Sequence, residues 1–546
     1  MTAVDARPGR TPVDPSASRT VGATVTGLAL RQIRRGALIV AALTAGMSAM
    51  VAATYASTVG DALDAAALAA LAENPAIRTL FGQPVALDDP GGFTVWRTGT
   101  ILAVLTGVWG LLSATRVTRG EEDAGRWDLL AAGPIPLATL VARHTVVLTA
   151  AATVTGLMAA ATLAAVGTAP RGALLHGLGI ALVGAYFVAA GTLAAQLFPT
   201  RSAASGATAA LLGAGLLLRM IGDGVGALGW LRWLSPFGLV ALSRPYEANR
   251  VLPLAVLAVV VAALLGATLV AARGRDLRRG WFSTAAGRPP RLWLLRSVPT
   301  FAARRLARPL IGWSAGVGAY YLLIGLLAIS MTDFLAENAR FADLAAQAGF
   351  GNLGSVEGYV AALFALLAIP AGTFAAVRIA ATATDEVERR QTLLYAQPVT
   401  RAGLLVAETA VTACGVIIIV TVAGLASWAG AALVDAPLSL GDALAGAMNV
   451  LPLTLLCLGA AVLALGWTPR IVALVGALPA AGGFLLKVTA DSTGAPGWVG
   501  RLSPFTHLAP VPDLPPNYLA AAIMLVSAVA FGVLGLLGYR RRDLRG

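Results

Sequence analysis

Long apolar stretches separated by short polar connections follow one another along nearly the whole chain. Each is long enough to cross the hydrocarbon core of a membrane, which takes about 20 helical residues. The residues do not alternate between polar and apolar as barrel strands do, so the pattern predicts an all-α polytopic membrane protein. The twelve predicted spans lie near 37–56, 98–115, 145–167, 173–197, 205–222, 251–272, 310–331, 358–377, 405–432, 442–466, 470–489 and 517–539.

Composition supports a membrane protein. Hydrophobic residues make up 57% of the chain and charged residues 12%, and the mean hydropathy is +0.77. A soluble protein of this length does not have such a composition. The polar segment 1–20 is expected to be a disordered cytoplasmic tail. Both cysteines lie inside predicted spans and the three histidines are scattered, so we expect no disulfide, metal site or catalytic set.

The positive charge of the chain is distributed unevenly between the two sides of the predicted membrane. Of the 40 Lys and Arg residues, 30 fall in segments that would share one side with both termini. Basic residues favour the cytoplasmic side of a membrane. This asymmetry predicts a plasma-membrane protein with both termini in the cytoplasm. It also explains most of the net charge of +13, so we expect no nucleic-acid partner.

The chain repeats itself at offsets of 264 to 273 residues. An even number of spans separates equivalent positions, so both copies enter the membrane from the same side and the repeats are parallel. We expect a first six-helix repeat over 21–285 and a second over 286–546. The matching segments are LRQIRRG with ARRLARP, EEDAGRWDLLAAGP with DEVERRQTLLYAQP, LLLRMIGD with FLLKVTAD, WLRWLSPF with WVGRLSPF, and RDLRRG with RDLRG.

The most charged of these repeats joins the second and third spans of each half, and we call it the cassette. Acidic residues precede a pair of leucines and then a proline, as expected of a short amphipathic helix. Such a helix can dock in a groove of a soluble partner; the alternative is a solvated loop. The residues concerned are Glu121, Glu122, Asp128, Leu129 and Leu130, and Asp385, Glu386, Glu388, Leu393 and Leu394.

The order of these features resembles the permeases of ABC-2 type exporters, in particular the duplicated actinobacterial type linked to tetronasin and multidrug efflux. The resemblance covers roughly 20–546 and rests on three features. These are the E-x6-L-L-x3-P cassette, the amphipathic segment before each first span, and the hydrophobic piece between spans five and six.

The resemblance implies that 119–134 and 383–398 are coupling helices, each docking in a cleft of an ATP-binding subunit. One chain would bind two copies of that subunit, which would hold ATP and Mg. The sequence itself has no G-x4-G-K-[ST] loop, so we expect a transport subunit and not an enzyme, with no cofactor of its own. The implied function is ATP-driven export of hydrophobic or amphiphilic compounds, such as antibiotics and drugs.

A basic residue followed four positions later by an acid ends the fifth span of each half, as Arg219 with Asp223 and Lys487 with Asp491. This spacing puts each pair on one helix face. The pairs can form an outer gate, since in the resembling fold these spans line the pathway, or they can anchor helix ends at the interface. The following LSPF pieces can likewise cap the pathway or form an interfacial aromatic belt.

Met and aromatic side chains from spans expected to border the centre are candidates for a substrate cavity, because they suit a broad apolar pocket. Ordinary helix packing explains most of them equally well. The candidates are Met47, Met50, Tyr55, Trp109, Met220, Tyr320, Tyr321 and Phe374.

The alternative function is a proton-coupled secondary drug transporter, which can also have two parallel six-span halves. It needs a buried carboxylate that carries protons, and acids in mid-span are almost absent here. Glu408 lies near the start of a span, and the loop between spans two and three lacks the G-x3-D-R-x-G-R pattern of that class. A membrane-embedded enzyme or scaffold has no catalytic cluster in its favour.

Overall fold

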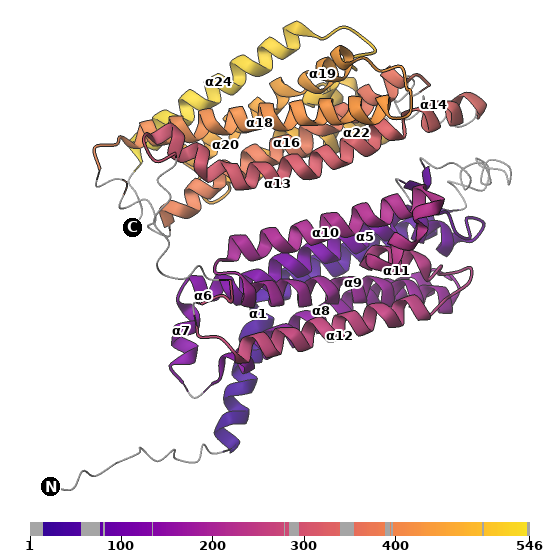
Figure 1. Cartoon of the computed structure of the whole chain (residues 1–546), viewed down its shortest axis with the longest axis vertical. Helices are drawn as coiled ribbons and strands as arrows, with labels where there is room; N and C mark the ends of the chain where they lie inside the picture. The colour runs from indigo at the N-terminus through magenta and orange to yellow at the C-terminus, as the bar shows by residue number, and fades with distance from the viewer. Residues whose placement is uncertain are drawn as a thin grey trace. The chain divides into compact units, whose positions relative to one another are not determined.

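The described part of the chain is helical and contains no β-strand. Contacts divide the chain into two compact units, Met1–Arg288 and Pro289–Gly546, here called unit 1 and unit 2 (Figure 1). The computed structural model describes residues 15–55, 77–79, 82–133, 135–277, 279–282, 294–338, 354–387, 394, 397–493 and 496–542.

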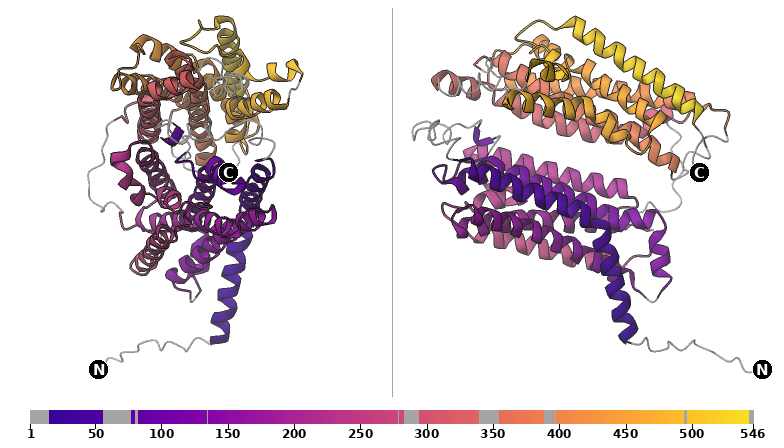
Figure 2. Two further views of the ribbon diagram at one scale, coloured as in Figure 1. Left: turned by 90° about the vertical axis from the view of Figure 1, so that its right-hand side faces the viewer. Right: turned by 180° about the vertical axis from the view of Figure 1, so that it is seen from behind.

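Unit 1 consists of long helices joined by short helical turns (Figures 1 and 2). The long helices are α1 (Pro15–Ala53), α5 (Pro90–Thr115), α8 (Leu137–Ala165), α9 (Pro170–Leu197), α10 (Arg201–Gly224) and α12 (Leu252–Arg273). The short elements are the π-helix η1 (Arg116–Gly120), α6 (Glu121–Asp123), α7 (Arg126–Ala131), the 3-10 helix η2 (Gly226–Leu234) and α11 (Pro236–Leu242).

Unit 2 follows a similar plan with a more broken fifth element. Its long helices are α13 (Val298–Leu326), α16 (Val356–Val387), α18 (Arg401–Ala432), α20 (Leu451–Trp467) and α24 (Tyr518–Arg541). Its shorter elements are α14 (Ala328–Glu337), α19 (Leu440–Met448), α21 (Val472–Ala477), the π-helix η3 (Leu478–Gly482), α22 (Gly483–Thr493), α23 (Gly497–Arg501) and the 3-10 helix η4 (Pro504–His507).

Eleven helices of the described chain are long and apolar enough to cross a membrane, so the protein is a multi-pass membrane protein. They coincide with eleven of the twelve predicted spans. The remaining one, predicted near 470–489, is the shorter apolar stretch Val472–Lys487. The π-helix η3 interrupts it at Pro479, which cannot donate a backbone hydrogen bond.

Local sequence explains where several helices begin. Asp89 accepts hydrogen bonds from the backbone N–H of Gly91 (2.7 Å) and Gly92 (3.1 Å), and Pro90 occupies the first turn of α5. Ser297 and Thr300 form a reciprocal capping box at the start of α13. Such caps satisfy backbone donors that have no partner inside the helix.

One helix is central in each unit. In unit 1, α9 packs against α5, α8, α10 and α12; in unit 2, α20 packs against α16, α18, α21 and α24. Small residues allow this crowding: a Cβ on Gly156 of α8 would lie 2.2 Å from the carbonyl oxygen of Gly177 on α9. Close approach of backbones through small residues is typical of helices packed in membranes.

The long helices of unit 1 run back and forth between two ends (Figure 2). We call the end with α6 and α7 the cassette end and the end with η2 and α11 the loop end, and we use the same names for the equivalent ends of unit 2. Helix α1 begins at Pro15, inside the segment expected to be disordered, and continues without a break into the first span.

Candidate functional site

The cassette of unit 1 is a sharp helical turn and not a single amphipathic helix. After α5, the chain passes through the π-helix η1 into α6. Gly125 then reverses its direction with a positive φ of 73°, which glycine adopts without a steric penalty. The six-residue α7 follows and ends at Ala131.

Glu122 is the buried anchor of this cassette, with an exposed fraction of 0%. Arg275, which follows α12, donates two hydrogen bonds to it, from Nη1 to Oε1 (2.6 Å) and from Nη2 to Oε2 (2.7 Å). The Nη1 of Arg119 lies 3.1 Å from the same carboxylate. Buried carboxylates need such partners, because leaving one unpaired is costly. Glu122 is therefore an internal contact and does not face a partner protein.

Further hydrogen bonds tie the cassette to the ends of other helices. The backbone N–H of Arg201, at the start of α10, donates to Asp123 Oδ2 (2.8 Å). Arg119 Nη2 donates to the carbonyl of Phe198, just after α9 (2.5 Å). Arg275 Nε donates to Gln196 Oε1 on α9 (2.8 Å). A displacement of the cassette would therefore act on α9, α10 and α12.

Helix α7 has one buried and one exposed face. Trp127 is buried in a cluster with Val25, Leu140, Val141 and Ala272, which come from α1, α8 and α12. Leu129 is 80% exposed. Leu130 and Asp128 are half-buried. An apolar side chain held out from a firmly anchored turn is suited to insertion into a groove of another protein.

The second cassette uses the same anchor. Arg542, which follows α24, and the hydroxyl of Tyr539 both donate hydrogen bonds to Glu386. Asp385 is paired with Arg305 of α13. Leu394 is half-buried, whereas Glu388 and Leu393 lie outside the described residues.

These pairs connect two of the sequence repeats. Arg275 and Arg542 are the first residues of the repeated RDLR segments, and Glu122 and Glu386 are equivalent positions of the repeated cassettes. The paired residues are 153 and 156 positions apart in the chain. Sequence reasoning treated the repeats separately and missed their contact. The sequence did contain a signal for this contact, because the cassette glutamate and the arginine of the RDLR segment both recur in the second half.

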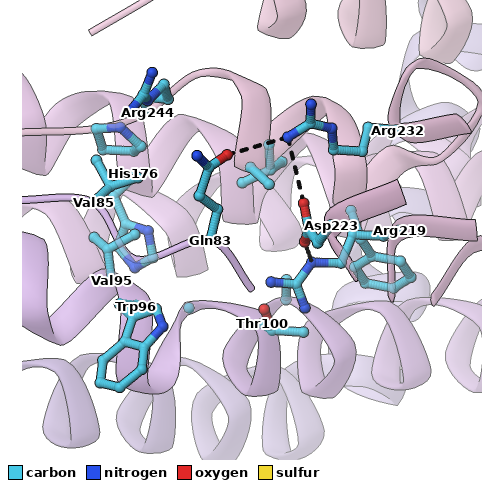
Figure 3. Close-up of a pocket in the computed structure, with 16 residues that line it drawn as sticks. Gln83, Val85, Val95, Trp96, Thr100, His176, Arg219, Asp223, Arg232 and Arg244 are labelled. Carbon is cyan, nitrogen blue, oxygen red and sulfur yellow. Dashed lines mark hydrogen bonds and ion pairs between the residues drawn. The ribbon is translucent and has the colours of Figure 1, made fainter. Parts of the chain in front are cut away.

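The proposed outer-gate residues of unit 1 form a buried ion-pair cluster at the loop end (Figure 3). Arg219 Nε lies 2.7 Å from Asp223 Oδ2, and Arg232 Nη1 lies 3.6 Å from Asp223 Oδ1. Their side chains meet within unit 1. In unit 2, Lys487 is half-buried, and the side chain of Asp491 lies outside the described residues.

The LSPF pieces fold back on the fifth helical element in the same way in both units. Ser235 Oγ donates to the carbonyl of Gly215 (2.6 Å), and Ser503 Oγ donates to the carbonyl of Gly483 (2.7 Å). Each hydroxyl also accepts from the N–H two residues later, which caps the following helical turn. The repeated serine therefore has a structural role.

The candidate cavity residues are mostly engaged within their own unit. Trp109 and Met220 are buried, as are Tyr321 and Phe374. Tyr321 donates to the carbonyl of Leu363 (2.8 Å) and its ring contacts that of Tyr320, while Phe374 packs on Trp313. Met47 packs on the cluster of Leu102, Ala159 and Ile180, and Tyr55 donates to the carbonyl of Leu87 (2.8 Å). Met50 is exposed.

Comparison with known proteins gives a consistent result over most of the chain. The family model described as "Multidrug efflux system permease Rv1217c, C-terminal domain" matches residues 23–273 and 295–540. A curated relative, the multidrug efflux system permease protein Rv1217c of Mycobacterium tuberculosis (strain ATCC 25618 / H37Rv), is 29% identical over 497 residues. That match covers 88% of this chain and 87% of the relative.

Proposed function

We propose, from the premise that this chain belongs to the Rv1217c family of multidrug efflux permeases, that it is the membrane subunit of an ABC-2 type exporter. It would expel hydrophobic or amphiphilic compounds with energy from a separate ATP-binding subunit. ATP and Mg would be held by that subunit, because this sequence has no P-loop.

The observation that carries this proposal is the anchored cassette of unit 1. Glu122 and Trp127 hold it to the helices of the unit, while Leu129 of α7 is left 80% exposed. A solvated loop needs neither a buried ion pair nor a buried tryptophan. A coupling element needs both an exposed contact and a stiff connection to the spans, since it must transmit force.

The contacts of the cassette indicate how the force would be transmitted. Closure of the ATP-binding partner would push on α7, and Glu122 and Asp123 would pass the displacement to the ends of α9, α10 and α12. A small displacement of the helix ends can then favour one of two packed arrangements of the spans.

The equivalent anchors support a tandem arrangement in which one chain supplies both halves of the pathway. The Glu122–Arg275 and Glu386–Arg542 pairs occur at equivalent sequence positions, as do the Ser235 and Ser503 hydrogen bonds. We therefore propose two parallel repeats, two docked ATPase copies per chain, and both cassette ends and both termini in the cytoplasm. This duplicated architecture also resembles that of the tetronasin-linked type.

The proton-coupled alternative is less compatible with the buried acids. Glu122, Asp223 and Glu408 are the buried acids of the described chain, and each lies within 3.3 Å of an arginine nitrogen. Each of these carboxylates is engaged in an ion pair within its unit, whereas a group that carries protons across a membrane must be free to exchange its partners.

Leu129→Asp tests the coupling proposal. The tagged chain is purified in mild detergent from the membranes of its own host and assayed for bound ATPase and for substrate-stimulated ATP hydrolysis. We expect wild type to retain two ATPase copies per chain. The variant should lose at least half of the bound ATPase, because the charge cannot enter an apolar groove without losing its hydration.

Leu252→Asp is the matched control, since Leu252 is also an exposed leucine but lies at the loop end of unit 1. It should leave ATPase binding unchanged. Normal ATPase binding by Leu129→Asp would refute the docking role of α7. A chain that purifies alone, with efflux abolished by an uncoupler and not by ATPase inhibition, would favour the proton-coupled alternative.

A further inference from the structure

A pocket at the loop end of unit 1 is separate from the cassette and takes no part in the coupling to an ATPase proposed above. Its free space, including the open mouth, is about 690 Å³. Side chains of α5, α9, α10, η2 and α11 line it, together with residues just before α5 and just after α11 (Figure 3).

His176 is the unusual residue of this pocket. It lies on α9 and is 1% exposed. Neither Nδ1 nor Nε2 has a hydrogen-bond partner among the described residues. Gly99 gives it room, since a Cβ there would lie 3.2 Å from His176 Cε1. A neutral imidazole offers one donor and one acceptor, and buried groups of this kind nearly always have a partner.

Charge in the pocket favours an anion. Three arginines line it, Arg219, Arg232 and Arg244, with the carboxylate of Asp223 among them, and Arg244 is also paired with Glu247 outside the lining (2.6 Å). Asp223 is already paired with Arg219 at 2.7 Å. Arg232, whose side chain is 23% exposed, lies 3.6 Å from Asp223 Oδ1 and hydrogen-bonds Gln83 Oε1 (3.3 Å), so it has the longest ion pair of the three arginines (Figure 3).

The loop that carries Arg244 is held in place by the half-buried side chain of Tyr246. The ring of Tyr246 packs directly against Gly91 and Gly172. A Cβ added to these glycines would lie only 2.2 Å and 2.5 Å, respectively, from the ring. Its hydroxyl shares a hydrogen bond with Thr168 Oγ1 (2.8 Å), and burial raises the pKa of Tyr246 to about 12. The loop that carries Arg244 is therefore fixed against the ends of α5 and α9.

The rest of the lining is largely apolar. Beyond the arginines and His176, the walls are formed mainly by Val85, Val95, Trp96, Ala103, Phe237, Val240 and Pro245. Apolar walls with a few convergent polar groups are typical of small-molecule sites. A ligand that contacts both the apolar walls and the arginines with His176 needs an apolar body and an acidic headgroup.

We propose that this pocket binds amphiphiles with an anionic headgroup, with Arg232 attracting the anion and His176 hydrogen-bonding the headgroup. Such a molecule can be an exported acid or an anionic lipid. Unit 2 has no histidine at the equivalent position of its sequence. When Arg201 and Arg470, which precede the fifth spans, are aligned with each other, Ala445 takes the place of His176.

Binding of dansyl-labelled undecanoic acid and of its uncharged methyl ester tests the proposal. The full chain in phosphatidylcholine nanodiscs is titrated with each probe. We expect wild type to bind the acid about tenfold more tightly than the ester, and both His176→Leu and Arg232→Gln to lose about tenfold in acid affinity. Arg250→Gln, at an exposed arginine beside the pocket loop, is the control and should bind as wild type does.

His176→Gln guards against a folding defect, because it keeps one donor and one acceptor and should retain most of the affinity lost in His176→Leu. Equal binding of acid and ester, or wild-type affinity in both His176→Leu and Arg232→Gln, would overturn the proposal.

Adding phosphatidylglycerol, an anionic lipid, to the nanodiscs distinguishes a lipid headgroup from a smaller exported acid as the natural ligand. Displacement of the acid identifies a lipid headgroup as occupant, and undiminished acid binding identifies a smaller acid; either outcome supports an anion site. No ATPase is present, so the result is independent of the coupling test.

Discussion

The cassette ends of units 1 and 2 use one anchor in two different surroundings. In unit 1, the Glu122–Arg275 pair is almost fully buried, and Gln196 Oε1 accepts a further hydrogen bond from the arginine. In unit 2, the side chain of Arg542 is 20% exposed. Leu465 aligns with Gln196 there, and a hydroxyl from Tyr539 completes the contact with Glu386.

The neighbouring positions differ even more. Glu408 of α18 bridges Arg305 (3.1 Å) and Arg378 (3.3 Å) in unit 2. The cassette alignment puts His144 at the equivalent position of α8. That imidazole packs against Trp127 with ring centroids 5.4 Å apart. An ion-pair network in one unit thus corresponds to an aromatic contact in the other.

The difference teaches which part of the cassette end is constrained. Both units have an acid in the cassette paired with a base after the last helix, while the surrounding support is aromatic in unit 1 and ionic in unit 2. If the anchor transmits force, its geometry must be kept, whereas its support only has to be stable. The predictions below test this view, beginning with the largest expected effect.

Arg275→Ala should destabilise the chain most. It removes two hydrogen bonds from the buried Glu122 carboxylate, and Arg119 stays 3.1 Å away. Breaking a buried ion pair typically costs about 3–5 kcal/mol. The measurement is the free energy of unfolding in SDS mixed micelles. Combining Arg275→Ala with Glu122→Gln removes both charges and should recover at least half of the loss. A loss below about 1 kcal/mol would show that Glu122 is not held by this pair.

Glu408→Gln should have the next largest effect, about 2–3 kcal/mol, because it leaves Arg378 without its carboxylate while Arg305 keeps Asp385. The same unfolding assay applies. Glu247→Gln is the control, since its ion pair with Arg244 is exposed and should contribute less than about 1 kcal/mol. Similar losses in the two variants would mean that the ionic network of unit 2 contributes no more than a surface pair.

Arg542→Ala should cost less than Arg275→Ala, about 1–2 kcal/mol. The pair is partly exposed, and Tyr539 still donates to Glu386 after the change. Equal losses for the two arginines would contradict the comparison of surroundings. ATP hydrolysis stimulated by substrate should nevertheless fall in both variants, because each anchor connects one cassette to its unit.

Ser235→Ala and Ser503→Ala should have the smallest effects, about 1 kcal/mol each. Both serines donate to a carbonyl of the fifth element at nearly equal distances, 2.6 and 2.7 Å, and Ser235 Oγ accepts one additional hydrogen bond, from Gly238 (3.2 Å). Thermal unfolding of the two purified variants should therefore give similar shifts. A clear difference between them would mean that the loop ends have diverged as the cassette ends have.

Local sequence was sufficient to locate the spans. Apolar run length is a property of neighbouring residues, and eleven predicted spans coincide with long apolar helices. It was less informative at 470–489, where apolar residues continue but Pro479 and a π-helix break the helix. It also missed that α1 begins well before the apolar run, at Pro15, because its polar first turns look like a tail.

The functional details could not be read from local sequence because they depend on distant residues. Glu122 was expected to be a surface contact, since its acidic neighbours look solvated; it is buried because Arg275 reaches it from 153 residues away. Leu129 and Leu130 were indistinguishable in sequence, and only the packing of Trp127 selects Leu129 as the exposed one. His176 was not singled out, because its lack of a partner appears only in the folded unit.

The separation of Glu122 from Arg275 also bears on how the protein is made. The acid leaves the ribosome 153 residues before its main partner, a delay of roughly 8 to 30 s at ordinary rates of synthesis. During that interval the cassette lacks the contact that seats it, so it cannot present α7 in its final position. An ATPase that recognises the cassette in its final position would therefore bind only after the sixth helix of the unit has been inserted. The ion pair that anchors the cassette would in this way restrict ATPase binding to fully inserted units.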